Sequence, residues 1–164
     1  MARVRDDQAL VASVLDRLLD DDPQTQVESP RSRNMVMRDM KQSVCRDLEN
    51  LLNTRWRLAS FPPALDELTT SLVNYGIPDF TGANMSQPTE RAALRRTIEA
   101  AIIRYEPRFK TVRVTILDED DDSGRTLRFK IEALMHAEPA PEPVVFDSQL
   151  EPATSTFEVK MGAK

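Results

Sequence analysis

The spacing of apolar residues changes at Pro107, and this change limits the folds that the chain can adopt. Before Pro107, apolar residues recur every three or four positions in segments 35–53 and 89–105, as on one face of an α-helix. After it, they alternate with polar residues in segments 112–116 and 127–133, as in half-buried strands. Helices followed by strands are typical of α+β proteins rather than wound α/β proteins. We therefore predict N-terminal helices packed on a small, mainly antiparallel C-terminal sheet.

The later part of the chain predicts two further short strands, at 144–147 and 157–160. Residues 148–156 fit either a loop or an extension of the strand before them. The acidic run 118–124 joins the first two strands. It lacks the spaced ligands and the terminal glutamate of a calcium-binding EF-hand loop, so we interpret it as a solvated hairpin turn.

The first part of the chain predicts a short amphipathic helix over 8–20 and a polar, proline-containing linker over 23–33. The apolar face of this helix carries Val11, Val14, Leu15 and Leu18. These features divide the chain into an N-terminal helix and linker, residues 1–33, and a single α+β domain, residues 34–164. The helix either docks on a partner or folds back on its own domain, and the sequence leaves both open.

A second short helix is predicted over 65–73, and its leucines are expected to face inward. These leucines are Leu65, Leu68 and Leu72. Gly76 follows and is expected to adopt a positive φ where this helix ends.

Composition excludes several classes of function. The 164 residues have a net charge of −5, which disfavours general nucleic-acid binding because that binding depends on clustered positive charge. One cysteine and one histidine do not form a common zinc site, and four separated glycines do not form a phosphate-binding loop. No run approaches the roughly 20 apolar residues of a membrane helix. We expect a cytoplasmic protein with no cofactor, metal, small-molecule substrate or membrane insertion.

One acid–base interpretation remains, and it concerns Glu106. This residue lies between Tyr105 and Phe109 at the predicted junction of helix and strand, where partial burial would favour a general acid of a glycoside hydrolase. The alternative is that Glu106 pairs with a nearby arginine or backbone amide within its own domain.

Four segments occur in an ordered combination: 13–18, 46–55 with Leu-Asn-Thr-Arg, 72–80 with Tyr-Gly-Ile-Pro-Asp, and 105–109 with Glu-Pro-Arg. Segments 127–134 and 145–147 continue the pattern. Together they resemble the TssE family of type VI secretion baseplate subunits, which is similar to the sheath-initiating wedge protein of contractile-tailed phages. The resemblance spans about residues 10–160.

The resemblance implies a structural role without catalysis. Such proteins sit in the baseplate wedge, bind its core and provide the platform on which the contractile sheath begins to polymerise. The expected partners are therefore other wedge subunits and sheath subunits, within a membrane-docked baseplate. The Glu-Pro-Arg motif is expected to contact the wedge core, and the expected interaction residues of the three motifs are Glu106, Pro107, Arg108, Arg55, Tyr75 and Asp79.

Two alternatives to this role stay open. Phage relatives have carried a lysozyme label, which favours a peptidoglycan-cleaving hydrolase that uses Glu106, although a cytoplasmic subunit has no ready access to peptidoglycan. A small regulator that binds a partner through the same fold is the other alternative.

Physical chemistry suggests two contact regions for an assembly role. Pro107 fixes its own φ and holds Glu106 and Arg108 on a rigid corner, where opposite charges suit either a contact with another subunit or a local ion pair. A small sheet also has edges with unpaired amides, to which a sheath subunit could add a strand. We expect that edge at 157–160.

Overall fold

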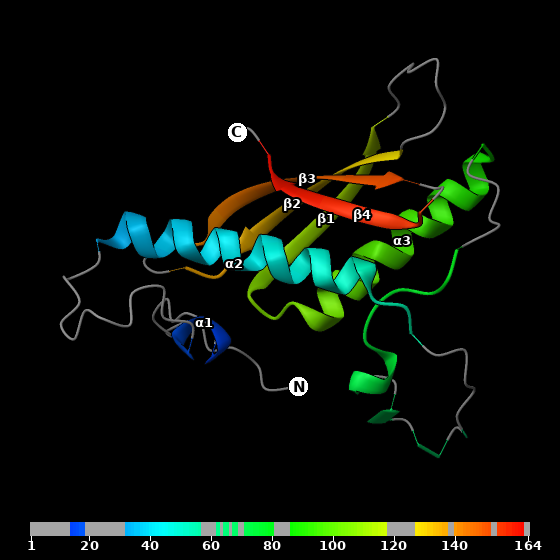
Figure 1. The fold of residues 1–164 in the computed structure, drawn as a ribbon, viewed down its shortest axis with the longest axis horizontal. Coiled ribbons are helices and arrows are strands. Elements are labelled where there is room, and N and C mark those ends of the chain that lie inside the picture. The colour runs from blue at the N-terminus through cyan, green and yellow to red at the C-terminus, as the bar shows by residue number, and fades with distance from the viewer. Residues whose placement is uncertain are drawn as a thin grey trace.

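A computed structural model of the chain confirms the α+β architecture (Figure 1). It describes residues 14–18, 32–56, 62, 64, 65, 67, 68, 71–80, 86–117, 127–137, 140–151 and 154–162. The helices come first along the chain: α1 (Val14–Leu18), α2 (Arg33–Asn53), the short 3₁₀ helix η2 (Leu72–Asn74) and α3 (Pro88–Tyr105).

Four strands form one antiparallel sheet in the order β1-β2-β3-β4. They are β1 (Phe109–Leu117), β2 (Leu127–Met135), β3 (Glu142–Glu151) and β4 (Thr156–Met161). Each predicted strand is present and is longer than predicted; the open question at 148–156 is answered, since β3 runs to Glu151 and β4 begins at Thr156. The acidic run 118–124 lies outside the described residues.

The strand register places apolar side chains on one face of the sheet. Val114 lies opposite Ile131, which lies opposite Phe146, and all three are at most 1 % exposed. Helices α2 and α3 cover this face, with α2 alongside β4 and α3 alongside β1 (Figure 1). Their predicted stripes supply the rest of the core: Met40, Val44, Leu48, Leu51, Leu52, Leu94, Ile98, Ala101 and Ile102 are all buried.

Both long helices begin slightly before their predicted first residues, for local reasons. Ser32 caps α2, because its hydroxyl accepts a hydrogen bond from the Met35 amide at 3.4 Å. Pro88 occupies the first turn of α3, where its missing N–H costs nothing. No described helix is long and apolar enough to cross a membrane.

Helix α1 lies within the predicted helix 8–20, whose other residues lie outside the described parts of the chain. Its apolar residues do not enter the core: Val14, Leu15 and Leu18 are 73 %, 55 % and 75 % exposed. Asp16 instead joins α1 to α2, as described below. The division of the chain at residue 33 stays a prediction.

The prediction of a helix over 65–73 is wrong. Of its described residues, Leu72 is 85 % and Leu65 is 50 % exposed, so the expected inward face does not form. The amide of Leu68 donates to the Leu65 carbonyl at 3.1 Å, and the Ser71 amide donates to the Leu68 carbonyl at 3.2 Å. These three-residue steps are 3₁₀-like, so leucines at helical spacing do not stay on one face. The positive φ predicted at Gly76 is confirmed, at 109°.

Candidate interaction site at the α3–β1 corner

The Glu-Pro-Arg motif forms the sharp corner between α3 and β1. Glu106 caps α3, with its amide donating to the Ile102 carbonyl at 2.9 Å. Its carboxylate turns back onto Arg108: Oε1 accepts from the Arg108 amide at 3.1 Å and from Nε at 2.6 Å, and Oε2 accepts from Nη2. Pro107 is exposed at the apex, whereas Glu106 is only 5 % exposed. The motif is therefore held by its own ion pair.

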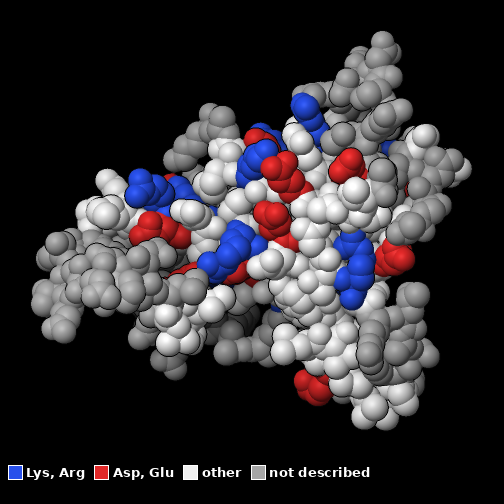
Figure 2. All heavy atoms as spheres, in the orientation of Figure 1, with Lys and Arg blue, Asp and Glu red and all other residues white. Residues whose placement is uncertain are grey.

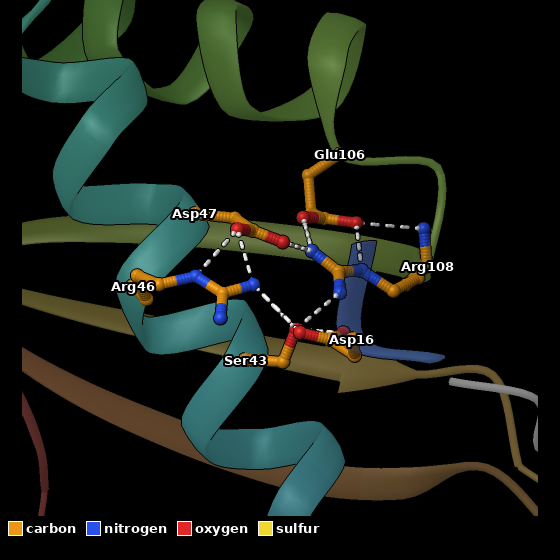
Figure 3. Close-up of polar contacts among 6 residues, drawn as sticks. All are labelled: Asp16, Ser43, Arg46, Asp47, Glu106 and Arg108. Carbon is orange, nitrogen blue, oxygen red and sulfur yellow. Dashed lines mark hydrogen bonds and ion pairs between the residues drawn. The ribbon is translucent and has the colours of Figure 1, made fainter. Parts of the chain in front are cut away.

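Arg108 also ties the corner to α2. Its Nη2 donates to Asp47 Oδ2 at 2.6 Å, and Nη1 donates to the hydroxyl of Ser43 at 3.4 Å (Figure 3). Burial alone would lower the pKa of Arg108, but the hydrogen bonds and negative charge of Glu106 and Asp47 outweigh it and raise that pKa above its ordinary value. Arg108 therefore stays charged between two carboxylates.

Helix α1 joins the same polar network. The Ser43 hydroxyl donates to Asp16 Oδ2 at 2.5 Å, and Arg46 Nη2 donates to Asp16 Oδ1 at 2.7 Å and to Asp47 Oδ1 at 3.2 Å (Figure 3). The hydrogen bond with Asp16 raises the pKa of Arg46. Polar contacts thus attach α1 to α2 while its apolar side chains stay exposed.

A hollow of about 410 Å³ lies beside the corner. Its walls are Asp47, Leu48, Leu51, Tyr75, Tyr105, Glu106, Pro107 and Arg108. The rings of Tyr75 and Tyr105 meet edge to face, with 5.2 Å between their centres. Burial raises the pKa of Tyr75, and the negative charges of Asp47 and Glu106 raise it further. The hollow offers apolar walls beside a fixed ion pair, which suits an inserted side chain of another protein.

The structure brings four of the six predicted interaction residues to this hollow: Tyr75, Glu106, Pro107 and Arg108. Arg55 and Asp79 do not line it. Arg55 donates to the carbonyls of Leu52 at 2.7 Å and Ser155 at 2.5 Å, and its guanidinium lies 4.7 Å from the ring centre of Phe80. Burial lowers its pKa, and the charge of Asp79 opposes that effect. Arg55 thus ties the end of α2 to the turn before β4.

Three further residues make contacts that the sequence did not predict: Ser43, Asp47 and Asn53. Nothing local marks Ser43 or Asp47, which are ordinary polar residues on a long helix and face Arg108 only in the folded chain. Asn53 lies within the Leu-Asn-Thr-Arg segment, but its partner Phe157 is 104 residues away, so the segment alone does not indicate the contact.

Charge on the face that carries α2 is mixed in sign. Figure 2 shows that acidic and basic side chains are interspersed on the face that carries α2. Among the described residues, no group of three or more acidic, histidine or cysteine side chains is placed to hold a metal ion.

The fold and the corner define a class: a small α+β domain in which two helices cover one face of a four-stranded antiparallel meander. Residues 38–140 match the family of the baseplate wedge protein gp25, and the chain belongs to this family. The gp25 family is structural rather than enzymatic. The family resemblance seen in the motifs is confirmed.

The comparisons also find two individual similarities. The anti-adapter protein IraD of Salmonella arizonae is 32 % identical over 75 residues, which cover 46 % of this chain and 57 % of IraD. The chain therefore spans little more than half the length of that relative. A chain of the baseplate complex from the type VI secretion system is 20 % identical, with a TM-score of 0.49 over 70 % of this chain and 96 % of that one.

The alternative of a hydrolase that uses Glu106 is not supported. A general acid needs a carboxyl group that reaches its substrate. Both oxygens of Glu106 accept hydrogen bonds from Arg108, and the residue is buried. The local ion pair that the sequence offered as the alternative is the arrangement observed.

Proposed function

We propose that this chain is a baseplate subunit of a type VI secretion system, on the cytoplasmic side of a membrane-docked assembly. There it binds the core of the wedge and helps to start the polymerisation of the contractile sheath. Membership of the gp25 family supports a wedge role. The observation that carries the wedge contact is the hollow that Tyr75 shares with the Glu-Pro-Arg corner.

The accessible part of this corner is Pro107 with the hollow beside it. Glu106 and Arg108 satisfy each other, so their charges fix the shape of the corner and do not reach outward. Tyr75, Tyr105 and Leu51 provide apolar walls. We therefore expect a wedge subunit to insert an apolar side chain here, because well-packed central pockets supply most of the binding energy of interfaces.

Pro107→Arg should weaken binding to the purified wedge-core subunits about tenfold or more, because a long cation at the apex blocks the hollow. Thr115→Arg is the matched control, since Thr115 is also exposed but lies on β1 away from the hollow. Affinity is measured by calorimetry, with melting temperatures expected within about 2 °C of the parent. Unchanged affinity of Pro107→Arg, or equal losses in both variants, would contradict the wedge contact.

A sheath strand would need backbone groups that point away from the sheet. The Gly162 amide donates to the Val145 carbonyl at 2.9 Å, so by antiparallel alternation Phe157, Val159 and Met161 direct their N–H and C=O groups outward from β4. Asn53 occupies both groups of Phe157, and the thiol of Cys45 donates to the Val159 carbonyl at 3.3 Å. These contacts favour Met161, which is 46 % exposed, as the accessible end of this edge.

Met161→Pro should abolish sheath initiation while the sheet stays folded, because proline removes an N–H that points away from β3. Met161→Leu keeps the N–H and an apolar side chain, so it is expected to behave like the parent. The assay counts sheaths formed from purified sheath subunits on assembled baseplates. Normal initiation by Met161→Pro would exclude this edge.

A regulatory function is a second candidate, supported by the similarity to an anti-adapter protein. Sedimentation separates the two: a wedge subunit is recovered with assembled baseplates and sheaths from the native cell, whereas a free regulator stays in the supernatant.

A further inference from the structure

Asn53 makes the contacts that a neighbouring β-strand would make. Its Nδ2 donates to the Phe157 carbonyl at 2.8 Å, and its Oδ1 accepts from the Phe157 amide at 2.8 Å. A side-chain carboxamide has the same C=O and N–H groups as a peptide bond. The last residue of α2 therefore pairs with the outward side of β4 as one peptide unit of a fifth strand.

This contact lies near the start of β4, on the first of the three residues whose backbone groups point away from β3. An edge strand with unpaired backbone groups attracts further strands, and proteins commonly cover such edges. Here the cover consists of two side chains of α2, Asn53 on Phe157 and Cys45 on Val159. Asn53 is exposed, so it can leave the edge without opening the core.

The opposite edge of the sheet, β1, is covered by a pair of charged side chains of α3. On β1, the Val114 amide donates to Glu99 Oε2 at 3.0 Å, and Arg95 Nη1 lies 3.5 Å from the Val114 carbonyl. Arg95 and Glu99 are themselves an ion pair at 3.3 Å. The β1–β2 register also shifts between Phe109 and Thr111, and such irregularities discourage pairing at an edge. A strand that joins the sheet would therefore meet less resistance at β4.

We propose that Asn53 is a replaceable plug of the β4 edge. In the free chain it satisfies Phe157. When an extended strand of another subunit enters from the open end at Met161, it displaces the Cys45 thiol from the Val159 carbonyl, and its peptide groups then take over both hydrogen bonds of Phe157. The exchange replaces two amide hydrogen bonds with two of the same kind, so little is lost at Phe157 itself. Only the identification of this strand with a sheath subunit rests on the proposed function.

The test uses the full chain with Asn53→Ala, and Asn50→Ala as the matched control. Asn50 is an exposed asparagine of the same helix, and its side chain makes no hydrogen bond within the described structure. Sedimentation velocity should show concentration-dependent self-association of Asn53→Ala, because its open edge pairs with that of a second copy, whereas the parent and Asn50→Ala stay monomeric. At dilutions where Asn53→Ala is still monomeric, hydrogen exchange at its Phe157 amide should be faster than in the parent and in Asn50→Ala.

Two further variants keep the inference falsifiable. Adding Met161→Pro to Asn53→Ala should restore the monomer, since the second copy then meets a blocked edge. Asn53→Asp keeps the acceptor for the Phe157 amide but loses the donor, so it should show the effect more weakly even if Asn53→Ala folds poorly. The proposal is wrong if both Asn53 variants stay monomeric with a folded sheet, or if the variant with the added proline still self-associates. Neither measurement needs a baseplate partner, so their failure is distinct from failure of the proposed function.

Binding to the sheath subunit distinguishes this proposal from one in which the Asn53 contact only stabilises the fold. Loss of the plug should lower the melting temperature of the free chain and yet increase its affinity for the sheath subunit severalfold. A contact that only supported the fold would lower both.

Discussion

Replacing Arg108 with methionine should lower the free energy of unfolding by roughly 3–5 kcal/mol, because it leaves a buried carboxylate without its partner. Glu106 is 5 % exposed and its side chain accepts hydrogen bonds only from Arg108 among the described residues. Asp47 is more exposed and keeps Arg46, so the loss concentrates at Glu106. Equilibrium unfolding in urea measures the difference.

Arg96→Met is the control for this change. Arg96 is an exposed residue of α3, and its loss should change stability by less than about 0.5 kcal/mol. Combining Arg108→Met with Glu106→Gln should recover part of the stability, because the buried site then holds no unpaired charge. A cost for Arg108→Met as small as that for Arg96→Met would show that the corner is not held by this ion pair.

This energetic role has a consequence for binding experiments at the corner. Substitutions of Glu106 or Arg108 disturb the connection between α3, β1 and α2, so a lost partner would not by itself identify a contact. Pro107 is the better probe, since it is exposed and outside the ion-pair network.

The sequence predicts the fold correctly wherever a long helix or strand buries only one of its faces. The stripe Val44, Leu48 and Leu52 and the alternation Val112, Val114 and Ile116 each report one buried face, and both elements are present. The prediction fails at Leu72, because three apolar residues at helical spacing are too few to distinguish a helix from successive 3₁₀ turns.

The site could be predicted only in part, because its partners are far apart in sequence. The motifs identified Glu106 and Arg108, two residues apart, and left their mutual ion pair open. The pairing of Arg108 with Asp47 spans 61 residues, and that of Asn53 with Phe157 spans 104. Such contacts depend on how α2 lies against the sheet, which no local pattern encodes.

Gly76→Ala should lower the free energy of unfolding by about 3 kcal/mol or more, because it combines backbone strain with a collision. Gly76 has φ of 109°, and an added Cβ would lie 2.2 Å from the carbonyl oxygen of Thr54. That oxygen accepts the amide of Ile77 at 2.9 Å, and Ile77 is fully buried. The side chain would thus separate the two segments that join the end of α2 to the residues lining the hollow.

Gly162→Ala is the matched control, because it adds the same methyl group at a glycine that φ does not constrain. Its Cβ would meet a methyl of Val145 at 2.8 Å, and a carboxylate oxygen of Asp147 and the carbonyl oxygen of Val145 at 3.2 Å, so it meets no backbone atom as closely as at Gly76. Its cost should stay below that of Gly76→Ala, at about 1–2 kcal/mol. Because Tyr75 precedes Gly76 and lines the hollow, Gly76→Ala should also weaken wedge binding at temperatures where the variant is folded. Equal stabilities of the two variants would show that the backbone at Gly76 yields without loss, and the hollow would then not depend on this turn.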